Sequence, residues 1–232
     1  MVSDRQRRVR RSPLLFTTPL VLLVLLALVL LWEIVRGNVT GELSRQWPWR
    51  LRLMDTDPLG SLLAVALAAV LGRAQFARTV RPALGWSASW GPGPFAPDEP
   101  AWNVGILNGG QQHAVVERVD YQLVPRGGTP GPWTDHAGLL ADLAGRRLVH
   151  GTHYRQMLLG AGFPLAGAAG HDVVPEGMYT QRFVDEIDVL LMRLRVTDAV
   201  GDSHERVMDL LRGARLERPG AGGGLIVRRP GE

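Results

Sequence analysis

The sequence contains neither cysteine nor lysine. Without cysteine the chain can form no disulfide and offers no thiolate ligand for zinc. Without lysine it cannot supply the Gly-Lys-Ser/Thr ending of a phosphate-binding loop, although the segment 105–113, GILNGGQQH, is rich in turn-forming residues. These two absences exclude disulfide-stabilised folds, cysteine–zinc sites and P-loop nucleotide binding.

Catalytic signatures are missing as well. The serines lack the Gly-x-Ser-x-Gly context of a nucleophile elbow: Ser87, Ser89, Ser203. The segment 184–188, VDEID, gathers three carboxylates, and paired carboxylates serve acid and base roles in many enzymes. Here the spacing favours the solvated side of a helix whose apolar side holds Phe183, Ile187 and Leu191. We therefore expect no catalytic residue, no cofactor and a protein that is not an enzyme.

The histidines supply an alternative. His150 and His153 stand three residues apart, and His171 or His136 could join them as metal ligands. Residues three apart on a strand point to opposite faces, which disfavours shared ligation. The glutamate of a helical His-Glu-x-x-His motif is also missing. We expect no metal site, and a membrane-tethered metal-dependent hydrolase using His150, His153 and His171 remains the second hypothesis.

The net charge of +4 is unevenly distributed. Residues 1–81 contain 12 arginines and five carboxylates, a net charge of +7, whereas residues 82–232 contain 14 arginines and 17 carboxylates, a net charge of −3. Arginines close to anionic lipid headgroups are favourable by about 1 kcal/mol each. The basic character thus belongs to the part that meets the lipid bilayer, and no nucleic-acid partner is expected.

The segment 13–36 predicts a transmembrane helix. Its apolar run from Leu14 to Val35 has 22 residues, enough to cross a hydrocarbon core of about 30 Å. A cleaved signal peptide would have a shorter apolar region ending in small residues. Here the run ends at Trp32, which we interpret as an interfacial anchor. An arginine-rich N-terminus, residues 1–12, precedes it.

A second membrane helix is expected over 58–80. Its uninterrupted apolar part, Leu59 to Leu71, has only 13 residues, about 20 Å of helix, and alone is too short to span. However, Asp57 followed by Pro58 is a favourable helix start. Arg73, in the last turn of a helix that ends at Phe76, can extend its side chain to the headgroups.

The arginine distribution favours a hairpin of two crossings over a single one. With the N-terminus in the cytoplasm, a hairpin places eight flanking arginines inside and four outside, namely Arg36, Arg45, Arg50 and Arg52, whereas a single crossing places five inside and seven outside. In this hairpin, Trp47 and Trp49 of the external loop 37–57 either lie among the lipid headgroups or are ordinary residues of a polar loop. We expect a two-pass protein of a bacterial plasma membrane with its C-terminal domain in the cytoplasm.

After residue 81 the pattern changes to short strands separated by turns. Alternation predicts strands over 83–90, 101–107 and 114–124, the last with Val115, Val119, Tyr121 and Leu123 on one face. The segment 136–145 predicts a short helix or turn. The segment 180–196 predicts a helix that passes into a strand near Leu190. The segments 153–160 and 203–211 predict further strands. We therefore expect a membrane-anchored α+β protein in which a helix hairpin precedes a mainly-β, immunoglobulin-like sandwich over 81–212, followed by a disordered tail over 213–232.

Three segments carry a resemblance: RAQFARTVRPALGW from Arg73, NVGILNGGQQHAVVERVDYQLV from Asn103, and RLRVTDAVGDSHERV from Arg193. Together they resemble bacterial membrane-anchored proteins of actinobacterial type, in which a transmembrane hairpin leads into an Ig-like sandwich. Those proteins have an Asn-x-Gly turn after the second strand and a strand, Asp-x-x-Gly, strand element near the end. The resemblance covers residues 73 to 211 and implies a fold without an activity.

The favoured hypothesis is a non-enzymatic, membrane-anchored interaction or accessory module with a protein partner. Open sheet edges and apolar loop residues such as Phe95 and Trp133 could recruit that partner, although burial as ordinary core or loop packing is the better explanation for either residue taken alone. A third hypothesis is a structural subunit of an envelope or transport complex. In that case the small residues of the second helix would pack against a larger partner: Ala64, Ala66, Ala68, Ala69.

Overall fold

The computed structural model describes residues 5–10, 13–96, 99–167 and 173–217, and it divides the chain into two compact units. One unit, residues 11–80, contains the two long helices and is called the helix pair. The other unit combines Met1–Arg10 with Arg81–Glu232 and is called the sheet domain. The sheet domain is therefore discontinuous in sequence, with the helix pair inserted after its first strand.

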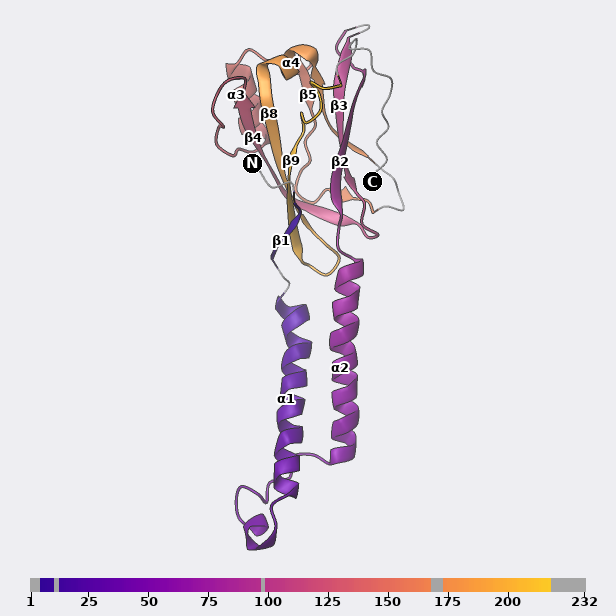
Figure 1. Ribbon diagram of the computed structural model, residues 1–232, viewed down its shortest axis with the longest axis vertical. Coiled ribbons are helices and arrows are strands. Elements are labelled where there is room, and N and C mark those ends of the chain that lie inside the picture. The colour runs from indigo at the N-terminus through magenta and orange to yellow at the C-terminus, as the bar shows by residue number, and fades with distance from the viewer. Residues whose placement is uncertain (1–4, 11–12, 97–98, 168–172, 218–232) are drawn as a thin grey trace. The chain divides into compact units, whose positions relative to one another are not determined.

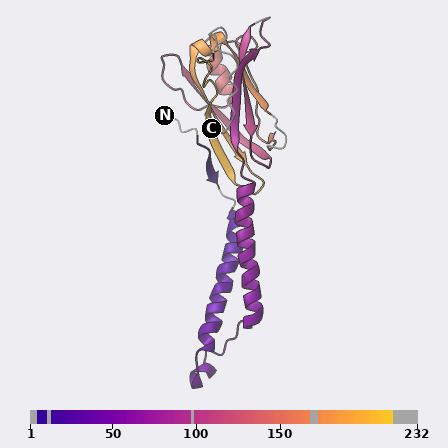
Figure 2. The same ribbon diagram turned by 45° about the vertical axis from the view of Figure 1, so that its right-hand side comes forward.

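The helix pair consists of α1 (Pro13–Gly37), the short 3-10 helix η1 (Gly41–Arg45) and α2 (Thr56–Thr79). The segments Thr17–Gly37 and Pro58–Thr79, of 21 and 22 residues, are long and apolar enough to cross a membrane. Figures 1 and 2 show α1 and α2 side by side from both directions. Two long apolar helices near the N-terminus were predicted, and this is confirmed.

The start of α2 differs from the prediction. The helix begins at Thr56 and its N-cap residue is Asp55, whose side chain makes no capping hydrogen bond. Asp57 as the cap was wrong by two residues. Proline is tolerated throughout a first helical turn, because none of the first amides has a partner within the helix. Pro58 therefore did not fix the first position.

The sheet domain contains two antiparallel sheets. The five-stranded sheet has the order β1-β9-β8-β4-β6, and the four-stranded sheet has the order β2-β3-β7-β5. The strands are β1 (Arg7–Arg10), β2 (Leu84–Pro92), β3 (Pro100–Asn108), β4 (Ala114–Pro125), β5 (Tyr154–Gln156), β6 (Pro164–Leu165), β7 (Val174–Thr180), β8 (Ile187–Thr197) and β9 (Ser203–Asp209). The helices α3 (His136–Gly145) and α4 (Gln181–Glu186) complete the domain.

One hydrophobic core lies between the two sheets. The alternation predicted for 101–107 is confirmed, since Trp102, Val104 and Ile106 are buried. The alternation predicted for 114–124 fails at its start, where Val116 is buried and Val115 is exposed. A register irregularity between Val116 and Arg118 shifts the alternation by one residue, as a β-bulge does.

Several element boundaries were not as expected. The strand predicted over 153–160 is only the three residues of β5, and β8 begins at Ile187 rather than near Leu190. Strands β1, β6 and β7 were not predicted. The ordered chain also continues past the expected end at 212, because Ala214 is fully buried and Arg215 donates to the carbonyl oxygens of Val184 and Ile187.

The Asp-x-x-Gly sequence predicted between two strands forms the turn between β8 and β9. The Oδ1 atom of Asp198 accepts hydrogen bonds from the amides of Val200 and Asp202, both at 2.9 Å. Gly201 follows with φ of +79°, a conformation that side chains with a Cβ rarely adopt. The Asp-x-x-Gly element therefore encodes this turn through local hydrogen bonding and a left-handed glycine.

Candidate functional site

The most informative contact in the sheet domain is the pairing of β1 with β9. Arg7 lies opposite Glu205, and Arg10 lies opposite Ser203, in antiparallel register. Strand β1 precedes α1 in the sequence, whereas β9 follows α2 by more than 120 residues. The residues just before the first helix and those far beyond the second helix therefore belong to one sheet.

Glu205 holds this pairing together. Its side chain is almost fully buried, and its two carboxylate oxygens accept bonds from Arg7 at 2.6 Å and from Arg195 at 2.7 Å. Burial acts to raise the pKa of Glu205, but the hydrogen bonds from Arg195 and Arg7 outweigh it and lower that pKa below the usual value. Glu205 therefore stays ionised and links β1 to β8 across β9.

Gln6 ties the same N-terminal segment to the other sheet. Its Nε2 donates to the carbonyl oxygen of Pro82 at 2.7 Å, and its Oε1 accepts from the amide of Leu84 at 2.9 Å. Arg206 of β9 also donates to the carbonyl oxygen of Leu84. The chain that enters α1 and the chain that leaves α2 thus meet at one end of the sheet domain.

The turn beside β1 adds a second set of polar contacts. Arg8 lies 3.4 Å from a carboxylate oxygen of Asp202, and His204 Nε2 lies 2.9 Å from Asp198 Oδ2. Asp198 and His204 are both buried. This set closes the β8–β9 hairpin and uses the same carboxylate that shapes the turn.

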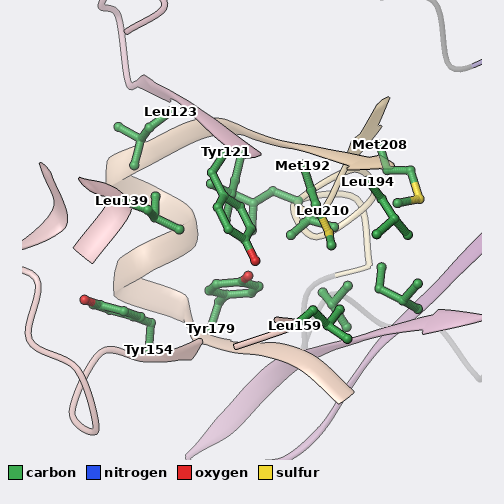
Figure 3. Packing of buried hydrophobic residues seen from close by; sticks show 14 of the residues in the cluster. Tyr121, Leu123, Leu139, Tyr154, Leu159, Tyr179, Met192, Leu194, Met208 and Leu210 are labelled. Atoms are coloured by element: carbon green, nitrogen blue, oxygen red, sulfur yellow. The ribbon is translucent and has the colours of Figure 1, made fainter. Parts of the chain in front are cut away.

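A separate polar cluster lies inside the core, built from both sheets. Tyr121 of β4 donates to Glu176 Oε1 at 2.5 Å, and Gln156 of β5 donates to the same oxygen at 2.7 Å. Tyr179 of β7 donates to Gln156 Oε1 at 2.7 Å. Figure 3 shows the hydroxyl groups of Tyr121 and Tyr179 facing each other across the core.

Glu176 is the acidic member of this cluster, and no cationic side chain among the described residues pairs with it. The residue is fully buried, and its Oε2 has no hydrogen-bond partner among the described residues. Burial raises the pKa of Glu176 to about 8, although the hydrogen bonds from Tyr121 and Gln156 act in the opposite direction. The carboxyl group is therefore protonated at neutral pH. Burial, together with Glu176, also raises the pKa of Tyr121.

The predicted interface residues Trp32, Trp47 and Trp49 lie around the end of α1. The rings of Trp32 and Trp49 stack with centroids 5.4 Å apart, and Trp32 Nε1 donates to the carbonyl oxygen of Leu51 at 3.1 Å. Trp47 is 84% exposed. The predicted residue Arg73 is half-buried on α2. The sequence pattern predicts an interface position for these residues but contains no signal for the stacking of Trp32 on Trp49.

Glu33 of α1 forms hydrogen bonds to the segment that connects α1 with α2. Its Oε1 accepts from the amide of Leu53 at 2.7 Å, and its Oε2 accepts from Arg36 at 2.8 Å. Only 4% of Glu33 is exposed. Glu33 therefore holds the segment between α1 and α2 against the end of α1.

The histidines proposed as metal ligands have protein neighbours instead. His153 Nδ1 accepts from the amide of Val149 at 2.8 Å, and its Nε2 lies 3.0 Å from Arg182. His150 packs edge-on against Tyr154. His171 lies outside the described residues. Within the described ranges, no group of three or more histidine or carboxylate side chains could hold a metal ion.

The remaining residues that the sequence suggested for partner contacts differ in how far they are buried. Trp133 is half-buried, and the guanidinium of Arg193 lies 4.5 Å from the centre of its ring, so this ring is not a free anchor. Phe95 is also half-buried. On α2, Ala66 is buried and the other small residues are exposed: Ala64, Ala68, Ala69.

Comparison of the chain with models of known protein families and with curated proteins finds no match.

Proposed function

We propose that this protein is a two-pass protein of a bacterial plasma membrane whose Ig-like sheet domain serves, on the cytoplasmic side, as a non-catalytic interaction module for a protein partner. The observation that carries the proposal is the pairing of β1 with β9. If both helices span the bilayer, the chain leaves the sheet domain at Arg10 and returns to it at Arg81. Two crossings allow this return, whereas a single crossing would separate β1 from its partner strand.

The Ig-like class is supported by the arrangement of the strands. Nine short strands form two antiparallel sheets in the described chain, and large aromatic side chains fill the space between them. The cytoplasmic orientation is supported by the arginine distribution, with eight flanking arginines on the proposed inner side and four on the proposed outer side.

The non-catalytic role is supported by how the charged side chains are used. Glu205 and Asp120 each bond to two arginines, and both ring nitrogens of His153 contact protein donors. These groups stabilise strands and turns. An interaction module needs a stable surface and an accessible sheet edge, and β2 supplies such an edge.

Single cysteines introduced into this cysteine-free chain test the topology. We expect Gln46→Cys, in the loop between the helices, to react with a membrane-impermeant maleimide in intact spheroplasts. Arg5→Cys and Ser89→Cys should react only after the membrane is permeabilised. All three side chains are exposed within their own unit, so burial does not mask the comparison.

The pattern across the three variants distinguishes the alternatives. Equal labelling of Arg5→Cys and Gln46→Cys in intact spheroplasts would contradict two crossings. Labelling of Arg5→Cys and Ser89→Cys without Gln46→Cys would keep the hairpin and reverse its orientation. Opposite behaviour of Arg5→Cys and Ser89→Cys would place the two ends of the sheet domain on different sides and overturn the proposal.

A further inference from the structure

The chain leaves the sheet domain and returns to it at the same end of that domain, which we call the junction end. Arg10, where the chain leaves, pairs with Ser203 at the start of β9. Ala83, just after the return, donates its amide to Asn108 Oδ1, in the last residue of β3, at 3.2 Å. Strand β4 begins after the turn that follows β3, and its start pairs with the end of β8. The junction end therefore contains the β3–β4 turn and the β8–β9 turn.

Exposed apolar side chains gather at this end. The amide of Met157, just after β5, donates to the carbonyl oxygen of Glu176 at 2.8 Å, near the start of β7. Strand β7 starts at the junction end, because it runs antiparallel to β3. The carbonyl oxygen of Phe163 accepts from the amide of Val116 at 2.9 Å, near the start of β4. The exposed apolar residues at this end are called the junction patch: Val115, Met157, Leu158, Phe163, Val173.

The rest of the sheet domain shows no comparable cluster among its described residues. Its other exposed large apolar side chains, Val9, Val149 and Leu216, belong to three separate segments. Val149 lies at the opposite end, because its carbonyl oxygen accepts from the amide of His153, whose own carbonyl accepts from Thr180, the last residue of β7. Val149 is therefore a suitable control position for the junction patch.

The charges at the junction end favour an anionic surface. Its carboxylates already accept hydrogen bonds within the domain: Asp198 from two turn amides, Asp202 from Arg8, and Glu117 from two hydroxyl groups. Arg10 and Arg81 are exposed at the same end. Apolar side chains beside arginines are typical of protein surfaces that bind the interface of a membrane with anionic lipids.

The length of the chain limits how far the junction end lies from the bilayer, provided that α2 spans it as proposed above. The candidate span Pro58–Thr79 ends two residues before Arg81. Two residues reach at most about 7 Å, and the headgroup region adds roughly 5–8 Å to each side of the hydrocarbon core. The junction end is thus held beside the lipid headgroups.

We propose that the junction patch inserts into the headgroup region of the bilayer that anchors the chain. The lipid surface then covers the exposed apolar side chains and fixes the orientation of the sheet domain on the membrane. The opposite end of the domain stays in water and is available to a protein partner. This inference rests on the proposed two-pass anchoring and adds a second, peripheral contact with lipid.

Single cysteines labelled with an environment-sensitive fluorophore test the insertion, because the chain has no cysteine of its own. The full chain is placed in nanodiscs of phosphatidylcholine and phosphatidylglycerol, in which part of the phosphatidylcholine carries a nitroxide quencher close to the headgroup. We expect the label at Leu158→Cys to be quenched about three-fold more strongly than the label at Val149→Cys. Leu158 and Val149 are both exposed, so burial within the domain does not account for a difference.

Two further positions separate this inference from the proposed function. Leu28→Cys in α1 and Leu67→Cys in α2 are exposed within the helix pair and should be quenched by a nitroxide placed deep in the acyl chains. If both are quenched while Leu158→Cys behaves like Val149→Cys, the insertion is wrong and the anchoring stands. If either helix position escapes quenching, the two-pass anchoring fails and the insertion fails with it.

The remaining outcomes are equally decisive. A label at Leu158→Cys that is shielded from water but not quenched by lipid nitroxides would assign the patch to a protein, and would overturn the insertion. As a second measurement, Leu158→Glu should lower the quenching of a label at Phe163→Cys by about two-fold, whereas Val149→Glu should not. Equal quenching with and without Leu158→Glu would also contradict the insertion.

Discussion

Glu176→Gln should abolish a loss of stability that the wild-type sheet domain undergoes between about pH 4.5 and pH 8. The carboxyl group is buried and pairs with no cation in the part of the chain that the structure describes, and its pKa in the folded protein is about 8 against an ordinary value of 4.5. Between these two values the folded protein holds a proton that the unfolded chain has released. The free energy of unfolding of the wild type therefore falls by about 1.4 kcal/mol per pH unit over this range.

The size of the effect follows from the width of this range. The total loss is at most about 5 kcal/mol, and it is complete once the folded carboxyl group ionises above pH 8. Glutamine keeps the shape and the accepting oxygen for Tyr121 and Gln156 but cannot ionise. The amide group of glutamine would find no hydrogen-bond partner at the position of Oε2, which costs free energy. The free energy of unfolding of the variant should therefore exceed that of the wild type by about 2–4 kcal/mol at pH 8. Below pH 4.5 the variant should be no more stable than the wild type.

Denaturant unfolding of the full chain in detergent, followed by tryptophan fluorescence from pH 4.5 to 9, measures this difference. Glu186→Gln is the matched control, because Glu186 is partly exposed and pairs with Arg182 on the surface of α4. That control should change stability by less than about 0.5 kcal/mol at every pH. Parallel pH profiles for Glu176→Gln and the wild type would show that Glu176 is not protonated in the fold.

Arg195→Met should destabilise the sheet domain by about 2–4 kcal/mol at pH 7. It removes one of the two arginines that bond to the buried carboxylate of Glu205 and leaves only Arg7, whose side chain is 73% exposed. A buried carboxylate that loses a charged partner lowers the free energy of unfolding, because the remaining interactions no longer offset its lost hydration. Methionine fills a similar volume, so the loss measures the electrostatic contact rather than a cavity.

The same variant has a pH signature opposite to that of Glu176. The pKa of Glu205 is lowered in the fold, so its contribution is present above about pH 4.5 and is lost as the pH falls through the lowered value. The difference between Arg195→Met and the wild type should therefore shrink below pH 4. Arg182→Met, which removes only the exposed contacts of Arg182 with Glu186 and His153, is the control. An equal loss for both variants would mean that Glu205 is not the group responsible.

The elements that the sequence predicted are those with a local signal. The two long helices follow from apolar runs, and β2, β3 and β4 follow from alternation of large apolar residues. The β8–β9 turn follows from Asp198 and Gly201, whose roles involve only neighbouring residues. The prediction for β4 placed Val115 instead of Val116 on the buried face, because a β-bulge shifts the alternation there. The position of a bulge depends on pairing with the partner strand, which the sequence of β4 alone does not show.

The missed strands depend on distant partners. Strand β1, RRVR, has one apolar residue, and its conformation depends on Glu205, 198 residues away from Arg7. Strand β7 contains Pro175, Glu176 and Gly177, a composition that predicts a turn. Its glycine is required because a Cβ at position 177 would collide with the ring of Tyr179. The buried cluster around Glu176 was missed for the same reason, since Tyr121, Gln156 and Glu176 meet only in the folded core.

The position of β1 at one edge of the five-stranded sheet has a consequence for biosynthesis. Residues 7–10 leave the ribosome before either helix has been made, and their partner strand, 203–209, emerges only after both helices. Closing a loop of nearly 200 residues has a high entropic cost for a free chain, but if both helices insert in a bilayer first, as proposed, they would hold the two ends close together. Membrane insertion would then act as a template for completing the sheet, and chains that failed to insert would be left with an unpaired arginine-rich strand.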